Sequence, residues 1–188
     1  ALLSKFGLPD TSPDFSLNGS VLFNTFTFIS VVILAPIFEE LIFRGMILNT
    51  LTKYNKMFAI IVTSLLFGLL HLNITQAIPA FFMSLVLCYM YVQTDSILVT
   101  ILAHAGNNLL ALMSVYSDNF VLITVVIMVF VIYGLITIIL KSKEVNAFIK
   151  EEKTNENWYA RFFKQIPNLL YLIFTILWII ISLFMNMF

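Results

Sequence analysis

Six polar side chains embedded in apolar stretches could together perform acid–base chemistry. They are two adjacent carboxylates, a guanidinium, two imidazoles and an amide: Glu39, Glu40, Arg44, His71, His104 and Asn108. Charged groups in a hydrocarbon setting are costly, so they are usually paired and usually functional. The chain has two histidines, and both lie in apolar stretches. We therefore predict a single site that uses all six groups.

The spacing of these groups places them in pairs on helix faces. Three pairs lie four positions apart in the chain: Glu40 with Arg44, Phe67 with His71, and His104 with Asn108. Residues with this spacing share one face of a helix, where opposite charges meet. We expect Arg44 to hold Glu40 as a fixed anion. Glu39 lies about 100° further round the helix and can border the same cavity with other contacts.

These groups fit the hydrolysis of an acyl group, such as a peptide bond, by activated water. A carboxylate beside a neutral imidazole can take a proton from water and create a nucleophile. A second imidazole and an amide supply two donors to the oxyanion of a tetrahedral intermediate. Removing one such donor typically costs about 100- to 1000-fold in rate.

Other readings of the same residues remain open. Glutamates and two histidines could also form a zinc site, although the HExxH pattern of many zinc proteases is absent. The groups could also be a satisfied structural network. We interpret Ser64, Ser84 and Cys88 as packing residues because none stands in a nucleophile motif.

The composition predicts an integral membrane protein. Of the 188 residues, 61% are hydrophobic and 11% are charged, whereas soluble domains are about 45–50% apolar and about 25% charged. The formal net charge is zero, which argues against nucleic acid as a partner.

The apolar runs predict an all-α, polytopic membrane bundle of about six to seven helices with an intramembrane polar cavity. A membrane strand would be shorter and would alternate. The first run covers 21–51, and Pro36 should kink or divide it. The remaining runs are 57–72, 77–92, 97–115, 120–140 and 168–188. We treat 1–188 as one integral membrane domain.

The basic residues predict the orientation in the membrane. Cytoplasmic loops carry an excess of Lys and Arg, so we expect Lys53, Lys56 and the 141–166 loop to be cytoplasmic. The interleaved aromatic residues of that loop suggest an anchor at the lipid headgroups. At about 1.5 Å per residue, Glu39 and His71 come out at the same depth, with His104 and Asn108 slightly deeper.

The three pairs resemble the signature motifs of a known family. Glu39-Glu40-x-x-x-Arg44, Phe67-x-x-x-His71 and His104-x-x-x-Asn108 are similar to those of the CAAX-protease and bacteriocin-processing family, also called the Abi or type II CAAX prenyl endopeptidase family. The similarity covers about residues 30–112. Members usually have further helices before the first motif, so we expect the chain to be a fragment or a trimmed protein.

The resemblance implies a glutamic-type intramembrane endopeptidase without a metal or other cofactor. Glu39 would activate water with help from His71, Glu40 and Arg44 would organise the site, and His104 and Asn108 would stabilise the oxyanion. The substrate would be a hydrophobic or lipidated peptide, as in CAAX, bacteriocin or peptide-pheromone processing.

The resemblance also implies a location and partners. We expect a multi-pass protein of the bacterial plasma membrane, in contact with membrane lipid and with a membrane protein as a further partner. Two alternatives are kept: a catalytically silent scaffold that regulates a membrane protein, and a zinc-dependent membrane metalloprotease.

Overall fold

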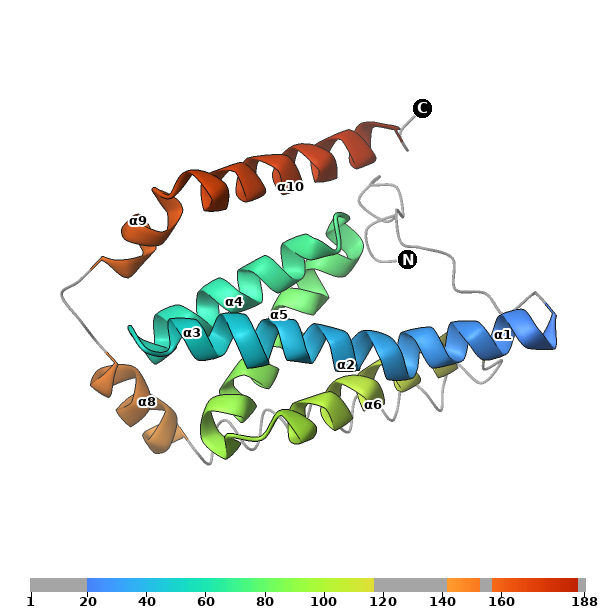
Figure 1. Cartoon of the computed structure of the whole chain (residues 1–188), viewed down its shortest axis with the longest axis horizontal. Helices are drawn as coiled ribbons and strands as arrows, with labels where there is room; N and C mark the ends of the chain where they lie inside the picture. Colours follow the sequence, from blue (N-terminus) through green and yellow to red (C-terminus); the bar gives the residue numbers. More distant parts are fainter. Residues whose placement is uncertain (1–19, 117–141, 153–156, 186–188) are drawn as a thin grey trace. The chain divides into compact units, whose positions relative to one another are not determined.

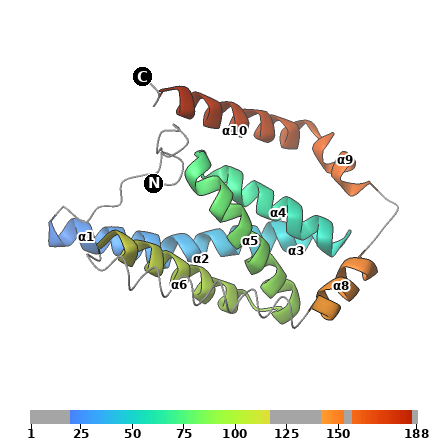
Figure 2. The ribbon, with the colours of Figure 1, turned by 180° about the vertical axis from the view of Figure 1, so that it is seen from behind.

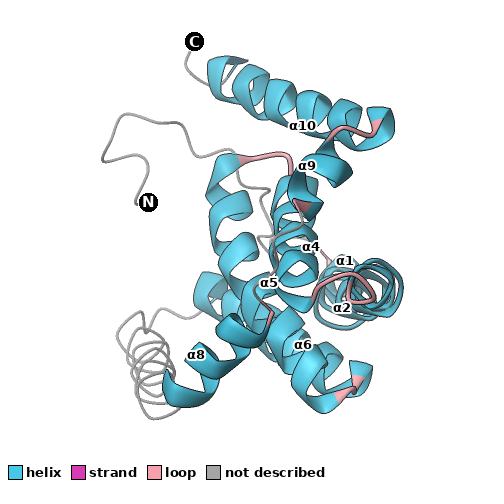
Figure 3. Ribbon diagram, turned by 90° about the vertical axis from the view of Figure 1, so that its left-hand side faces the viewer, coloured by secondary structure: helices cyan, strands magenta, loops and turns pink. Residues whose placement is uncertain are grey.

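A computed structural model of the chain describes residues 20–116, 142–152 and 157–185. These residues form helices joined by turns, with no strand among them (Figures 1 and 3). The predicted all-α fold is therefore confirmed. The helix predicted over 120–140 lies outside the described residues.

The first helix runs without a break from Val21 to Leu51 and is long enough to cross a membrane. It alternates between α and π geometry: α1 (Val21–Phe28), η2 (Ile29–Leu34), α2 (Ala35–Glu40), η3 (Leu41–Leu48) and α3 (Asn49–Leu51). Pro36 does not divide it. Proline cannot donate to the preceding turn, and the helix adapts with the wider turn of η2, after which Ala35 N–H bonds to Ser30 O, five residues back.

The remaining described helices are α4 (Lys56–Leu70), α5 (Ile74–Thr94), α6 (Ile97–Tyr116), α8 (Ser142–Glu151), α9 (Trp158–Phe163) and α10 (Ile166–Met185). Asn55, Asn73 and Asn157 accept from backbone N–H groups at the starts of α4, α5 and α9. The prediction that the third run starts at 77 was wrong by one turn, because Asn73 caps a helix that begins at Ile74.

Among the described residues, two further helices, Ile74–Thr94 and Ile166–Leu183, are also long and apolar enough to cross a membrane. The loop predicted over 141–166 contains the helices α8 and α9. The chain turns after α5 at Asp95, which adopts a left-handed conformation with φ of 49°.

The described residues divide into two compact parts. The first part takes in 40–100 and 157–185, and the second takes in 20–39, 101–116 and 142–152. Whether the chain is one domain stays a prediction.

In the first part, α4 and α5 pack closely against each other (Figure 2). Gly68 permits this approach, since a Cβ at Gly68 would lie 2.8 Å from the backbone oxygen of Ala77 and 3.1 Å from Phe81 Cβ. The hydroxyl of Tyr171 on α10 donates to Leu66 O on α4 at 3.0 Å. The rings of Phe43 and Phe67 meet edge to face, with centroids 5.0 Å apart, and join η3 to this pair.

Candidate active site

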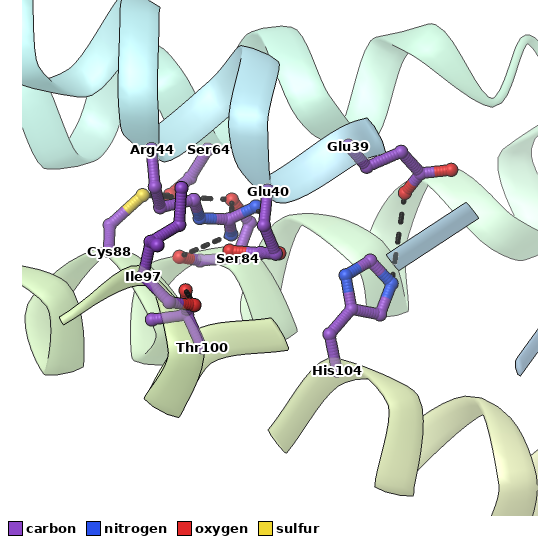
Figure 4. A network of polar contacts seen from close by, with 9 residues as sticks. All are labelled: Glu39, Glu40, Arg44, Ser64, Ser84, Cys88, Ile97, Thr100 and His104. Atoms are coloured by element: carbon purple, nitrogen blue, oxygen red, sulfur yellow. Dashed lines mark hydrogen bonds and ion pairs between the residues drawn. The ribbon is translucent and has the colours of Figure 1, made fainter. Parts of the chain in front are cut away.

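The buried guanidinium of Arg44 connects η3 to α4 and α5 (Figure 4). Its Nη1 donates to Glu40 Oε1 at 2.8 Å, and both side chains are fully buried. Its Nη2 donates to Ser84 Oγ at 2.9 Å and lies 3.4 Å from Ser84 O. Its Cζ lies 5.0 Å from the centroid of the Phe67 ring. The ion pair predicted between Glu40 and Arg44 is thus confirmed.

This arrangement suits arginine and its planar fork of donors. One guanidinium can bind a carboxylate and a hydroxyl at the same time while its flat face rests on an aromatic ring. The π-helical segment η3 carries Arg44 directly after the two glutamates, and π segments are frequent at functional sites. The close packing of α5 on α4 at Gly68 brings Ser84 within reach.

The polar contact of Ser84 could not be predicted from the sequence. We interpreted Ser84 as a packing residue, whereas its hydroxyl accepts a hydrogen bond from the buried Arg44. Ser64 and Cys88 fill the space beside it, with Cys88 Sγ 3.7 Å from Ser64 Oγ and 3.8 Å from Ser84 Oγ. A serine in an apolar run gives no signal that a cation from another helix will meet it.

His71 ends α4 and is held by the residue one turn earlier. Its Nδ1 lies 3.1 Å from Phe67 O, and the two rings meet edge to face with centroids 5.3 Å apart. Because a carbonyl oxygen only accepts, Nδ1 must carry the proton in this contact. A neutral His71 therefore has its basic lone pair on Nε2.

In the second part, Glu39 lies next to His104 (Figure 4). Glu39 Oε2 is 3.7 Å from His104 Nε2, and the Glu39 side chain is 27% exposed while that of His104 is almost completely buried. The distance exceeds that of a direct hydrogen bond, so a water molecule can bridge the two groups.

Asn108, one turn after His104 on α6, binds the first helix. Its Nδ2 donates to Val31 O at 2.9 Å, on the π-helical segment η2. The amide is therefore fixed in direction, and a substrate oxygen would have to compete with this carbonyl for the amide hydrogens.

The two adjacent carboxylates thus have different surroundings. Glu40 is fully buried against Arg44, whereas Glu39 is partly exposed beside a histidine. The predicted pairing of Glu39 with His71, and a polar cavity shared by all six residues, stay predictions. One cavity of about 240 Å³ lies between α4, α5 and α10 and is lined by apolar side chains.

Metal ligands are not gathered in the described part of the chain. No group of three His, Cys, Asp or Glu side chains there lies close enough together to hold a metal ion.

The six candidate site residues lie within a segment that matches a known protein family. Residues 21–110 match the family described as type II CAAX prenyl endopeptidase Rce1-like. The chain is also 35% identical over 77 residues to "Putative membrane peptidase YdiL" of Bacillus subtilis (strain 168). That alignment covers 40% of this chain and 32% of the relative, so the chain spans about a third of the relative's length. No solved structure matches the chain.

The motif-based resemblance is confirmed by this match, which covers all three motifs. The matched family and the apolar helices place the chain in a membrane.

Proposed function

Residues 21–110 match the family of type II CAAX prenyl endopeptidases described as Rce1-like, and on this premise we propose that the chain is an intramembrane endopeptidase. It hydrolyses a peptide bond with water activated by Glu39 and His71. Glu40 and Arg44 organise the site, and His104 and Asn108 stabilise the oxyanion. No metal takes part in the catalytic centre of this proposal.

The observation that carries the proposal is the 3.7 Å separation between Glu39 Oε2 and His104 Nε2. In hydrolysis the attacking oxygen and the oxyanion are bonded to the same carbon, so the base and the oxyanion donor must be close neighbours. A carboxylate and an imidazole N–H at this separation can contact these two oxygens at once. Glu40, locked by Arg44, supplies no such pair.

The path of the proton can be assigned to individual side chains. The carboxylate of Glu39 takes a proton from water as the water oxygen attacks the scissile carbonyl, and the Nε2 lone pair of His71 assists. The negative charge on the former carbonyl oxygen is met by donors from His104 and Asn108. The proton then passes to the leaving amine as the C–N bond breaks.

The proposed substrate is a hydrophobic or lipidated peptide. The family description supports CAAX-like processing, and bacteriocin or peptide-pheromone processing belongs to the same substrate class. We place the protein in the bacterial plasma membrane as a multi-pass protein, with Lys53, Lys56 and the 141–166 loop in the cytoplasm. The contact between the rings of Tyr54 and Trp158, with centroids 5.2 Å apart, supports one common side for the segments around these two residues.

A cleavage assay in detergent tests the proposal. The purified chain is incubated with quenched hydrophobic and prenylated peptides, with and without a chelator. We expect cleavage that the chelator does not affect and that Glu39→Gln lowers by about 100- to 10,000-fold, the usual contribution of a general base. Glu144→Gln, which removes an exposed carboxylate on α8, is the matched control and should keep full activity.

The same assay separates the alternatives. Loss of cleavage on chelation would identify a metal enzyme and overturn the water-activating glutamate. No cleavage of any peptide, together with a membrane protein that co-purifies stably, would instead identify a scaffold.

A further inference from the structure

An aromatic cluster joins α9 to the start of α4, within the first part of the chain. Trp158 packs against Tyr54 with the ring centroids 5.2 Å apart and the ring planes tilted by 50°. The ring of Phe58 contacts those of Tyr159 and Phe162 edge to face, with centroid distances of 5.2 Å and 5.9 Å. These contacts hold the short helix α9 against the turn that precedes α4.

The ends of α9 are fixed as well. Asn157 Oδ1 accepts from Ala160 N at 3.0 Å, which caps the helix. Asn168 Nδ2 on α10 donates to Phe162 O at 2.9 Å, which fixes the elbow between α9 and α10. The side chains of α9 are therefore held in place. We call the two joined segments, 52–58 and 157–165, the platform.

This platform lies where the apolar helices leave the bilayer. The first span ends at Leu51 and the last span begins at Ile166, on either side of the platform in sequence, and α4 begins at Lys56. Apolar helices begin and end at the headgroup level, where tryptophan and tyrosine are enriched.

The platform carries exposed positive charges and no negative ones. Lys53, Lys56, Arg161 and Lys164 are all exposed, and segments 52–58 and 157–165 contain no carboxylate. The helix α8 differs, since Lys143 and Lys150 there alternate with Glu144 and Glu151. Glu156, next to the platform in sequence, lies outside the described residues.

Two rings complete the surface. The guanidinium of Arg161 lies over Trp158, with Cζ 5.0 Å from the ring centroid, so its charge is held at the indole. Burial raises the pKa of the Tyr159 phenol, which keeps this side chain neutral beside any anion. A held set of cations, with rings at the headgroup level, complements a phosphate group that sits above an acyl chain.

We propose that this surface, formed by Lys53, Lys56, Arg161 and Lys164 around Trp158, binds the headgroups of anionic phospholipids. Each cation adds attraction to a negatively charged leaflet, while the aromatic rings enter the interface. The proposal is independent of the catalytic activity, because no residue of the candidate active site takes part.

Tryptophan fluorescence tests the proposal directly, since the chain has two tryptophans, Trp158 and Trp178. Trp178→Phe leaves Trp158 as the reporter, in vesicles of phosphatidylcholine that contain equal fractions of either brominated phosphatidylglycerol or brominated phosphatidylcholine. We expect the anionic lipid to quench Trp158 at least about twofold more, with the difference shrinking as salt screens the charges.

The second tryptophan provides the matched control. Trp158→Phe leaves Trp178, which lies twelve residues into α10 and hence about 18 Å from its start at 1.5 Å per residue. Trp178 should be quenched equally by both lipids. Equal quenching of Trp158 by both lipids would overturn the proposal.

Charge removal identifies the residues responsible. In the Trp178→Phe background, replacing all four cations by glutamine should abolish the preference, read as the ratio of quenching by the two lipids within each variant. Lys143→Gln with Lys150→Gln, which removes two charges from α8, should leave the ratio unchanged. The double change Lys53→Gln and Lys164→Gln, which spares the Arg161–Trp158 contact, should halve the preference and serves if the fourfold variant does not fold. A preference that is undiminished in the cation variants would also overturn the assignment.

Discussion

The guanidinium of Arg44 on η3 donates to the hydroxyl of Ser84 on α5, forty residues further along the chain, at 2.9 Å. The ion pair between Glu40 and Arg44 is therefore held from outside its own helix. Two packed helices, α4 through Phe67 and α5 through Ser84, determine where Arg44 points. This relationship leads to the first two predictions.

Replacing Ser84 by alanine should destabilise the protein and lower its turnover. The change removes the hydroxyl acceptor of a buried cation, and hydrogen bonds to charged groups contribute about 1.5–3 kcal/mol. The midpoint of thermal unfolding in detergent and the cleavage rate of a hydrophobic peptide measure the two effects.

Ser64→Ala is the matched control for Ser84. Ser64 is equally buried, but its hydroxyl contacts the weakly polar Cys88 Sγ at 3.7 Å. We expect a smaller loss of stability and little change in turnover. Equal effects of the two substitutions would mean that Ser84 serves packing alone.

Replacing Arg44 by lysine should abolish most activity although the charge is kept. A single ammonium cannot reproduce the fork that binds Glu40 and Ser84 together. We expect turnover to fall at least about tenfold, as when catalytic groups lose their positioning. Arg44→Gln, which also removes the charge, should be no more active. Full activity of Arg44→Lys would show that charge suffices.

Replacing Asn108 by alanine should lower kcat far more than it changes KM. An oxyanion donor acts mainly on the charge that develops in the transition state, and its loss costs about 100- to 1000-fold in rate. Asn146→Ala removes the same amide from an exposed position on α8 and should change kcat less than about twofold, within the range of ordinary surface substitutions. An unaltered kcat for Asn108→Ala would exclude this side chain from the mechanism.

Replacing Gly68 by alanine should force α4 and α5 apart. The new Cβ would lie 2.8 Å from Ala77 O, a backbone atom that cannot turn away, and overpacking of this kind costs about 1–3 kcal/mol. Gly106→Ala is the control, because nothing lies within 4 Å of a Cβ at that position, and there alanine favours the helix. The midpoint of thermal unfolding is measured for both variants, and an equal decrease in the two midpoints would contradict the argument.

The helical class and the local pairs could be predicted from the sequence. Long apolar runs fix the spans, and the four-residue spacing alone brings Glu40 to Arg44. The contact between Arg44 and Ser84 could not be predicted, because no periodicity within one helix reports which residue of another helix will face it.

Errors at helix ends had a similar origin. The apolar runs 57–72 and 77–92 predict a break between them, whereas Asn73 caps α5 and the next three residues form its first turn. The 141–166 segment was treated as a loop because its charges mask the short helices α8 and α9. The proposed catalytic roles of the six site residues remain predictions, and the variants above test those of Glu39, Arg44 and Asn108.

The pairing of Glu40 and Arg44 within one helix bears on how the chain is made. A lone arginine near the centre of a membrane helix costs about 2.5–3.5 kcal/mol on translocon-insertion scales. Here the counter-ion sits one turn away on the same helix, so the charge can be neutralised as that helix enters the bilayer, without help from α5. The bond to Ser84 needs α5 in place, so it can form only when the helices pack together.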